Sequence, residues 1–310
     1  MRIYNTAQIM INPVAESIGM KAWKALLEEV YTTPKPGLVD LYSCGAHNDM
    51  DITTFERSAD ALYPWFVHMA ALGYGFAGSP QALFQKIRPV GILAEKAMYK
   101  ATGGVNTHKG LIFTLGVFCA AAGRLAGESA EITCDSLILT EKQMTVSALT
   151  EELADIRLGE AHSNGEKNLH RYGSQGIRGE AIRGYPSVVN LALPVLREGI
   201  AAKRDWNRVK LQTLMVLMSS LEDSNILSRH DPSVLRQVKK EAEDFLSRGG
   251  AYSEGAMEEL MRMDADYIRR NISAGGCADI LAAAVFLEML LEEESSAAPG
   301  QSRPLRTAAY

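Results

Sequence analysis

The spacing of its apolar residues constrains this chain more than any other feature, because it follows the helical period almost throughout. Apolar side chains recur three and four residues apart on single faces, as in Trp23, Leu26, Leu27, Val30 and Tyr31, and again in Leu211, Leu214, Met215, Met218 and Leu221. Short β-like runs such as residues 132–139 occur, but no hairpin dipeptide joins two alternating strands. The pattern predicts an all-α fold of ten or more helices.

Capping signals divide the chain into these helices. Asn, Ser or Asp precedes Pro at residues 12–13, 79–80 and 231–232, where the polar side chain caps a helix that begins at the proline. Thr53 with Glu56 fits a capping box, and Gly249 is placed to end a helix. The expected helices span about 12–31, 53–76, 79–100, 106–126, 147–162, 186–202, 205–221, 232–248, 253–270 and 276–293.

We expect a single compact multi-helix domain over residues 1–294. The chain has 310 residues, of which 47% are hydrophobic, and this is enough apolar material for one large core. Residues 295–310 are small, polar and interrupted by Pro and Gly, which predicts a disordered tail.

Charge and hydropathy argue against several classes of protein. The net charge is -5 and Lys and Arg do not cluster, so no nucleic-acid partner is expected. The N-terminal segment shows no apolar h-region followed by a small-residue cleavage site, and no apolar run reaches the roughly 20 residues that cross a bilayer. We therefore expect a cytoplasmic protein with no membrane partner. The cysteines form no CxxC pair and are expected to be free thiols: Cys44, Cys119, Cys134 and Cys277.

The segment GGVNTHKG at residues 103–110 is the first candidate binding loop. Its glycines allow close approach of a ligand, Asn106 or Thr107 can cap the apolar helix that follows, and Lys109 adds a positive charge. Gly follows Lys109, so the segment is not a Walker-type P-loop. A phosphate-binding loop and a merely structural capped helix are both compatible with this pattern.

A second glycine-rich segment covers residues 173–186. Arg178 and Arg183 are suited to clamp phosphates, and Glu180 lies between them. A carboxylate flanked by arginines is either their structural partner or a catalytic group that they hold ionised. The pattern alone leaves both interpretations open.

Acidic residues recur in three further loops. His47, Asp49 and Asp51 lie in GAHNDMD, whereas Asp223 and Asp279 each adjoin an apolar helix. Carboxylate oxygens suit Mg²⁺, which often keeps waters and binds substrate phosphates. A zinc site is not expected, because no second His or Cys lies at ligand spacing. Each aspartate taken alone is equally compatible with a helix cap or a turn.

Several of these segments together carry a specific resemblance. They are EVYTTPKPGLVD (29–40), GAHNDM (45–50), RPVG (88–91), GVNTHKG (104–110), RGEAIRGYP (178–186), DSN (223–225) with Arg229, and NISAGGCAD (271–279). In this order they resemble the triphosphoribosyl-dephospho-CoA synthase family over about residues 21–292. That family makes the prosthetic-group precursor of citrate lyase and, in relatives, of malonate decarboxylase. Asp51 lies outside the family motif.

The resemblance implies an all-helical enzyme that uses ATP and 3′-dephospho-CoA. The triphosphoribosyl group of ATP would move to the 2′-hydroxyl of 3′-dephospho-CoA, and adenine would be released. This is glycosyl transfer, so the triphosphate stays intact. Mg²⁺ is expected with ATP. The product would serve the acyl carrier subunit of citrate lyase through its prosthetic-group transferase.

Roles follow for the residues in the matching motifs. The attacking hydroxyl needs a carboxylate to accept its proton, and a carboxylate also stabilises an oxocarbenium-like centre. The candidate catalytic residues are Glu180, Asp49, Asp223 and His47, with His47 or His108 placed to donate to the departing adenine. The candidate substrate-binding residues are Lys35, Asn106, Thr107, His108, Lys109, Arg178, Arg183 and Arg229. The candidate Mg²⁺ ligands are Asp49, Asp223 and Asp279.

Other functions are compatible with the same loops. One alternative is the malonate decarboxylase counterpart, and another is a Mg²⁺-dependent nucleotide-binding protein with other ribosyl or phosphoryl chemistry. A helical scaffold without turnover is a third, although a scaffold has no need to gather Lys, Arg, Asp, Glu and His around glycines.

Overall fold

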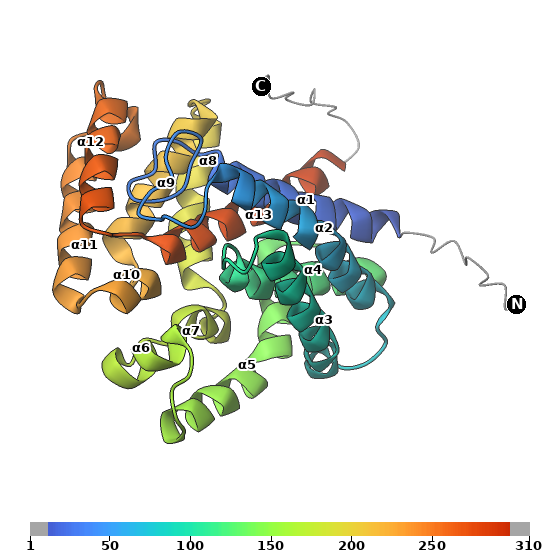
Figure 1. Cartoon of the computed structure of the whole chain (residues 1–310). Helices are drawn as coiled ribbons and strands as arrows, with labels where there is room; N and C mark the ends of the chain where they lie inside the picture. Colours follow the sequence, from blue (N-terminus) through green and yellow to red (C-terminus); the bar gives the residue numbers. More distant parts are fainter. Residues whose placement is uncertain (1–11, 298–310) are drawn as a thin grey trace, which may run out of the picture.

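The computed structural model describes residues 12–297, with side chains to Glu292, and these residues form helices and no strand (Figure 1). The all-α expectation is confirmed. The helices are α1 (Pro13–Val30), α2 (Ile52–Gly75), α3 (Pro80–Ala101), α4 (Lys109–Gly127), α5 (Cys134–Leu158), α6 (Asn164–Tyr172), α7 (Gly176–Arg183), the π-helix η1 (Ser187–Ala192), α8 (Leu193–Ala201), α9 (Trp206–Ser220), α10 (Ser224–Arg229), α11 (Pro232–Ser247), the 3₁₀ turn η2 (Gly250–Tyr252), α12 (Ala256–Arg269) and α13 (Gly275–Ala297).

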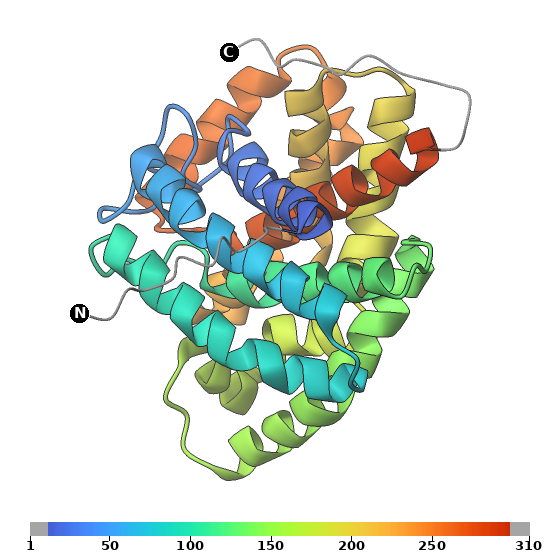
Figure 2. The same ribbon diagram turned by 90° about the vertical axis from the view of Figure 1, so that its right-hand side faces the viewer.

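The helices α4 and α13 form the centre of one compact core. Helix α4 packs against α1, α2, α3, α5 and α13, and Figure 2 shows it crossing behind α2. Among the described helices, α4 alone is long and apolar enough to pass as a membrane span by length and composition. Its mean hydropathy is 1.6, and 72% of that window is buried by the rest of the protein. This is the environment of a central helix in a folded core.

Most of the expected caps form. The Asn12 side chain accepts from Val14 N at 2.9 Å, and Ser79 and Asp231 cap α3 and α11 in the same way. The capping box expected at Thr53 and Glu56 is wrong. Asp51 caps α2 instead, accepting from Thr54 N at 2.9 Å, while the Thr54 hydroxyl oxygen accepts from the Asp51 backbone N–H at 3.3 Å. An aspartate two residues earlier than Thr53 therefore starts the helix.

The largest errors of the sequence prediction fall between residues 130 and 230. The β-like run 132–139 belongs to α5, which begins at Cys134 because Thr133 and Ser136 form a capping box. Segments expected to be loops contain α6, α7 and α10. The helix expected over 186–202 is divided between η1 and α8. The glycines in and around α7 lower the local helix signal there, and tertiary packing supplies the stability that propensity does not.

The expected end of the domain also moves. Helix α13 continues to Ala297, past the predicted boundary at 294, and residues 298–310 of the expected tail lie outside the described residues. The four cysteines are free thiols as expected, with Cys119 and Cys277 buried and Cys44 exposed.

Candidate active site

One cavity collects the loops that the sequence singled out. It has a volume of about 1120 Å³ and lies where the segments before α2, α4, α7, α10 and α13 meet. This exceeds the ordinary range of roughly 300–1,000 Å³ for a small-molecule site, so a large substrate or two substrates can be accommodated. Every candidate residue except Lys35 lines it: His47, Asp49, Asn106, Thr107, His108, Lys109, Arg178, Glu180, Arg183, Asp223, Arg229 and Asp279.

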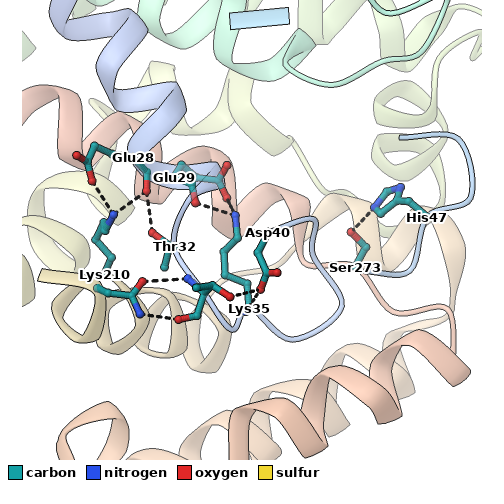
Figure 3. Close-up of polar contacts among 10 residues, drawn as sticks. Glu28, Glu29, Thr32, Lys35, Asp40, His47, Lys210 and Ser273 are labelled. Carbon is teal, nitrogen blue, oxygen red and sulfur yellow. Dashed lines mark hydrogen bonds and ion pairs between the residues drawn. The ribbon is translucent and has the colours of Figure 1, made fainter. Parts of the chain in front are cut away.

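Lys35 is placed differently from the prediction. Its side chain is 1% exposed, forms an ion pair with the Glu29 carboxylate and donates to the Glu29 carbonyl at 2.8 Å (Figure 3). The Asp40 carboxylate accepts from the Lys35 backbone at 2.9 Å, so the whole PKPGLVD turn folds back on the end of α1. Glu29 lines the cavity, whereas Lys35 does not. Lys35 thus neutralises Glu29 and acts on a ligand only through it.

His47 and Arg229, which both line the cavity, contact each other. Arg229 Nη2 lies 3.2 Å from His47 Nδ1, and His47 Nε2 lies 3.1 Å from the Ser273 hydroxyl. The second guanidinium nitrogen of Arg229 donates to the Ala46 carbonyl at 2.9 Å. Burial and the Arg229 charge lower the pKa of His47 to about 4. His47 is therefore neutral at pH 7 and offers hydrogen bonds rather than a proton.

The GVNTHKG segment combines a cap with a buried histidine. Asn106 Oδ1 accepts from the Lys109 backbone at 3.2 Å, which caps the first turn of α4. The Thr107 hydroxyl donates to Ser58 at 2.7 Å, and the Ser58 hydroxyl lies 2.7 Å from His108 Nδ1. Burial, reinforced by the charge of Lys35, lowers the pKa of His108 to about 3. This histidine is neutral too and serves as part of the cavity wall.

The first turn of α4 faces a carboxylate. A Cβ on Gly110 would lie 2.2 Å from Asp279 Oδ2, so only glycine admits this approach. Burial, the Glu29 charge and the Asp223 charge hold the pKa of Asp279 well above its ordinary value. We call Glu29, Asp223 and Asp279 the acidic wall. It places carboxylates beside the first turn of α4, which the sequence pattern of the GGVNTHKG segment did not indicate.

Asp223 is committed to the backbone. It is 2% exposed and accepts from Asn225 N at 2.8 Å, Ile226 N at 3.1 Å and Cys277 N at 2.8 Å. It therefore caps α10 and joins it to the start of α13. Burial raises its pKa, although these three hydrogen bonds oppose the shift. The structural interpretation of this aspartate applies.

The aspartates do not form a preassembled metal centre. Within residues 12–292, no group of three His, Cys, Asp or Glu side chains is arranged to hold a metal ion. Asp49 is exposed, and Asp223 is engaged with backbone N–H groups. The expected set of Asp49, Asp223 and Asp279 is thus not a ready three-carboxylate site. The donors fit a Mg²⁺ ion that arrives on a polyphosphate and needs only one or two carboxylates.

The two arginines of RGEAIRGYP lie at the edge of the cavity. Glu180 accepts from Ser187 N at 3.1 Å, from the Ser187 hydroxyl at 3.0 Å and from Arg183 at 3.1 Å. Arg178 pairs with Glu152 at 3.6 Å. Lys109 pairs with Glu95 at 2.7 Å and its side chain is 54% exposed. We call Lys109, Arg178 and Arg183 the basic rim.

Several residues of the site were not foreseen. Glu29, Ser187 and Ser273 line the cavity, and Ser58 holds His108. Glu29 is the first residue of the motif EVYTTPKPGLVD, and Ser273 lies within NISAGGCAD, although both motifs were quoted for other residues. Their presence in these motifs was the signal that could have identified them. Ser58 lies inside α2 with no distinguishing pattern.

Comparison with known proteins decides the family. A family model described as ATP:dephospho-CoA triphosphoribosyl transferase matches residues 15–298. The chain belongs to this family. The 2-(5''-triphosphoribosyl)-3'-dephosphocoenzyme-A synthase of Klebsiella pneumoniae is 38% identical over 291 residues, which cover 91% of this chain and 96% of that protein. The synthase of Escherichia fergusonii is 37% identical over 284 residues, covering 91% and 94%. Membership makes this chain a transferase. No solved structure matches it.

Proposed function

We propose that this chain transfers the triphosphoribosyl group of ATP to the 2′-hydroxyl of 3′-dephospho-CoA and releases adenine. The observation that carries the proposal is the single large cavity, in which a basic rim stands beside an acidic wall. Two polyanionic substrates need cations at the entrance, and a developing carbocation needs carboxylates nearby. The names of the relatives support the same reaction.

The reaction breaks one bond at the ribose C1′, forms another, and needs a base for the attacking hydroxyl. The bond from the ribose C1′ to adenine N9 breaks, with its electron pair leaving on adenine, and the 2′-oxygen of dephospho-CoA bonds to C1′. The hydroxyl proton passes to a carboxylate, and a proton from solvent neutralises the departing adenine, so that neutral adenine is released. Glu180 suits this role best, because its side chain remains 15% exposed in the cavity although Ser187 and Arg183 donate to it, whereas Asp223 is only 2% exposed and Asp49 is exposed.

The charge pattern also orients ATP. Lys109, Arg178 and Arg183 attract a triphosphate, whereas the acidic wall offers it no free cation, so the phosphates belong at the rim. The ribose then extends toward the wall, where negative charge stabilises an oxocarbenium-like centre. His47 and His108 are neutral and assist adenine by hydrogen bonding only.

Mg²⁺, the cellular setting and the use of the product are part of the same proposal. Mg²⁺ would be held by the triphosphate together with one or two carboxylates such as Asp49 and Asp279, and it would offset phosphate charge. The reaction would take place in the cytoplasm. The product would supply the acyl carrier subunit of citrate lyase through its prosthetic-group transferase.

The deciding experiment incubates the purified protein with ATP, Mg²⁺ and 3′-dephospho-CoA and measures free adenine by chromatography. Adenine that forms only with both substrates present is the expected result. ADP as product would replace the proposal with phosphoryl transfer. Adenine formed without dephospho-CoA would indicate a ribosyl hydrolase.

A further inference from the structure

The turn after α7 has an unusual backbone. Gly184 has φ 79° and Tyr185 has φ 52°, so two successive residues lie in the left-handed region. Glycine adopts this conformation freely, whereas a tyrosine does so only when its surroundings impose it. The sequence Gly184–Tyr185–Pro186 therefore depends on what holds the Tyr185 side chain.

The Tyr185 side chain is anchored in the core between α4 and α5. It is fully buried, and its ring centroid lies 4.7 Å from that of Phe118 on α4. Burial raises the pKa of its hydroxyl, the charge of Glu141 on α5 adds to this rise, and a hydrogen-bonding interaction with Thr114 on α4 opposes it. The ring and the hydroxyl thus contact the two helices that α7 packs against.

Three buried polar atoms in this cluster lack a partner in ordinary hydrogen-bond geometry. They are the Tyr185 hydroxyl, Thr114 Oγ1 and Glu141 Oε2, and each of the three residues is at most 1% exposed. Buried polar atoms in folded proteins are nearly always paired, and Thr114 and Glu141 both act electrostatically on the Tyr185 hydroxyl. The three atoms therefore form one polar cluster in the core.

Glu141 contributes as a neutral carboxyl. Burial raises its pKa to about 8, and only the bond from Thr145 and the charge of Lys142 oppose this shift. At pH 7 its carboxyl carries a proton, so the cluster contains a donor as well as acceptors. Lys142 and Glu180 are the formally charged groups that act on Glu141 and Tyr185.

The same turn holds the candidate base. Tyr185 N donates to the Glu180 carbonyl at 2.8 Å, and two residues later Ser187 donates from its backbone and its hydroxyl to the Glu180 carboxylate at 3.1 and 3.0 Å. Any displacement of Tyr185 therefore moves both groups that hold Glu180.

We infer that Thr114, Glu141 and Tyr185 form a buried polar anchor that positions the Glu180 carboxylate. Glu141 and Tyr185 are positioning residues, since neither lines the cavity. The catalytic consequence rests on the proposed function, but the anchor itself does not.

The first test compares Tyr185→Phe with Tyr74→Phe. Tyr185→Phe keeps the ring against Phe118 and removes the hydroxyl, whereas Tyr74 is 41% exposed and lies outside the cavity. We expect kcat to fall about tenfold to hundredfold in Tyr185→Phe, because small misplacements of a catalytic group have effects of this size. The Kd for ATP should stay within about threefold of wild type, because Tyr185 does not line the cavity. A threefold change in Kd corresponds to less free energy than one typical hydrogen bond contributes. Equal turnover of the two variants would refute the anchor.

The second test compares the pH dependence of kcat in the wild type and in Glu141→Gln, in which the side chain at position 141 is neutral at every pH. In the wild type, kcat should decline as pH rises through about 8, because Glu141 loses the proton that the anchor uses. Glu141→Gln should lack this decline. An alkaline limb that is identical in both proteins would contradict the role of Glu141.

A third measurement needs no turnover. Infrared spectra of the wild type at pH 7 should show the carbonyl band of a protonated buried carboxyl that is missing from Glu141→Gln and that shifts away above pH 9. Absence of that band would overturn the anchor. If the band is present and no adenine forms with any protein, the proposed function fails and the anchor stands.

Discussion

Substitution by Met should affect two lysines of the quoted motifs, Lys35 and Lys109, in different ways: one variant should lose stability and the other should lose affinity for ATP. Lys35→Met removes the cation beside Glu29, where the two side chains are 1% and 5% exposed. Lys109→Met removes a cation paired with Glu95, where the exposures are 54% and 30%. We expect Lys35→Met to destabilise the protein and Lys109→Met to weaken ATP binding.

The magnitudes follow from burial. Removing one partner of a buried ion pair leaves an uncompensated charge and costs about 3–5 kcal/mol, a large share of a typical 5–15 kcal/mol of folding free energy. An exposed pair contributes about 0–1 kcal/mol, so Lys109→Met should leave the free energy of unfolding nearly unchanged. A charged contact to phosphate contributes about 1.5–3 kcal/mol, which corresponds to roughly a tenfold to hundredfold increase in the Kd for ATP.

Urea denaturation gives the stabilities and isothermal titration calorimetry gives the ATP affinities. The double variant Glu29→Gln/Lys35→Met is the matched control, because it removes the orphaned charge and should recover most of the lost stability. The reasoning would be refuted if Lys35→Met unfolded like the wild type yet bound ATP weakly. Normal ATP binding by Lys109→Met would remove Lys109 from the substrate contacts.

Three further outcomes are expected. In Glu180→Gln the Kd for ATP, measured by calorimetry, should stay within about threefold of wild type. Adenine release should be at least about a hundredfold slower, because removal of a general base has effects of this size. Near-normal release would exclude Glu180 as the base. Asp223→Ala should lower the free energy of unfolding in urea by about 2–4 kcal/mol, because three backbone N–H groups lose their acceptor, and a loss of less than about 1 kcal/mol would contradict this account. Glu141 is neutral in the folded protein up to about pH 8 but ionises near 4.5 when unfolded, so the native state retains the proton across this interval. The wild type should therefore lose up to about 1.4 kcal/mol per pH unit relative to Glu141→Gln as pH rises from 4.5 to 8; parallel stability profiles would show that Glu141 is ionised in the fold.

The sequence predicts the helical class and the contents of the cavity better than the middle of the fold. Caps such as Asn12 and Ser79 are local, so pattern and structure agree there. Helix α7 was missed because four glycines surround Glu180 and weaken the local signal, whereas its stability comes from α4 and α5. The role of Lys35 was missed because it too depends on tertiary structure. Its partner is only six residues away, but a turn had to fold back on α1 before the pair existed.

The separation of charge inside the cavity explains how a chain with net charge -5 can handle two polyanions. The cations stand at the exposed rim, where they meet phosphates with little desolvation cost. The carboxylates stand at the buried wall, where burial and mutual repulsion raise the pKa of Asp279 and burial raises that of Asp223. Such carboxylates are stabilised most by an arriving positive charge, because it relieves the repulsion that shifts them. In the proposed reaction positive charge develops only as adenine departs, so the wall favours the transition state over bound ATP, which is the requirement for raising kcat rather than merely lowering KM.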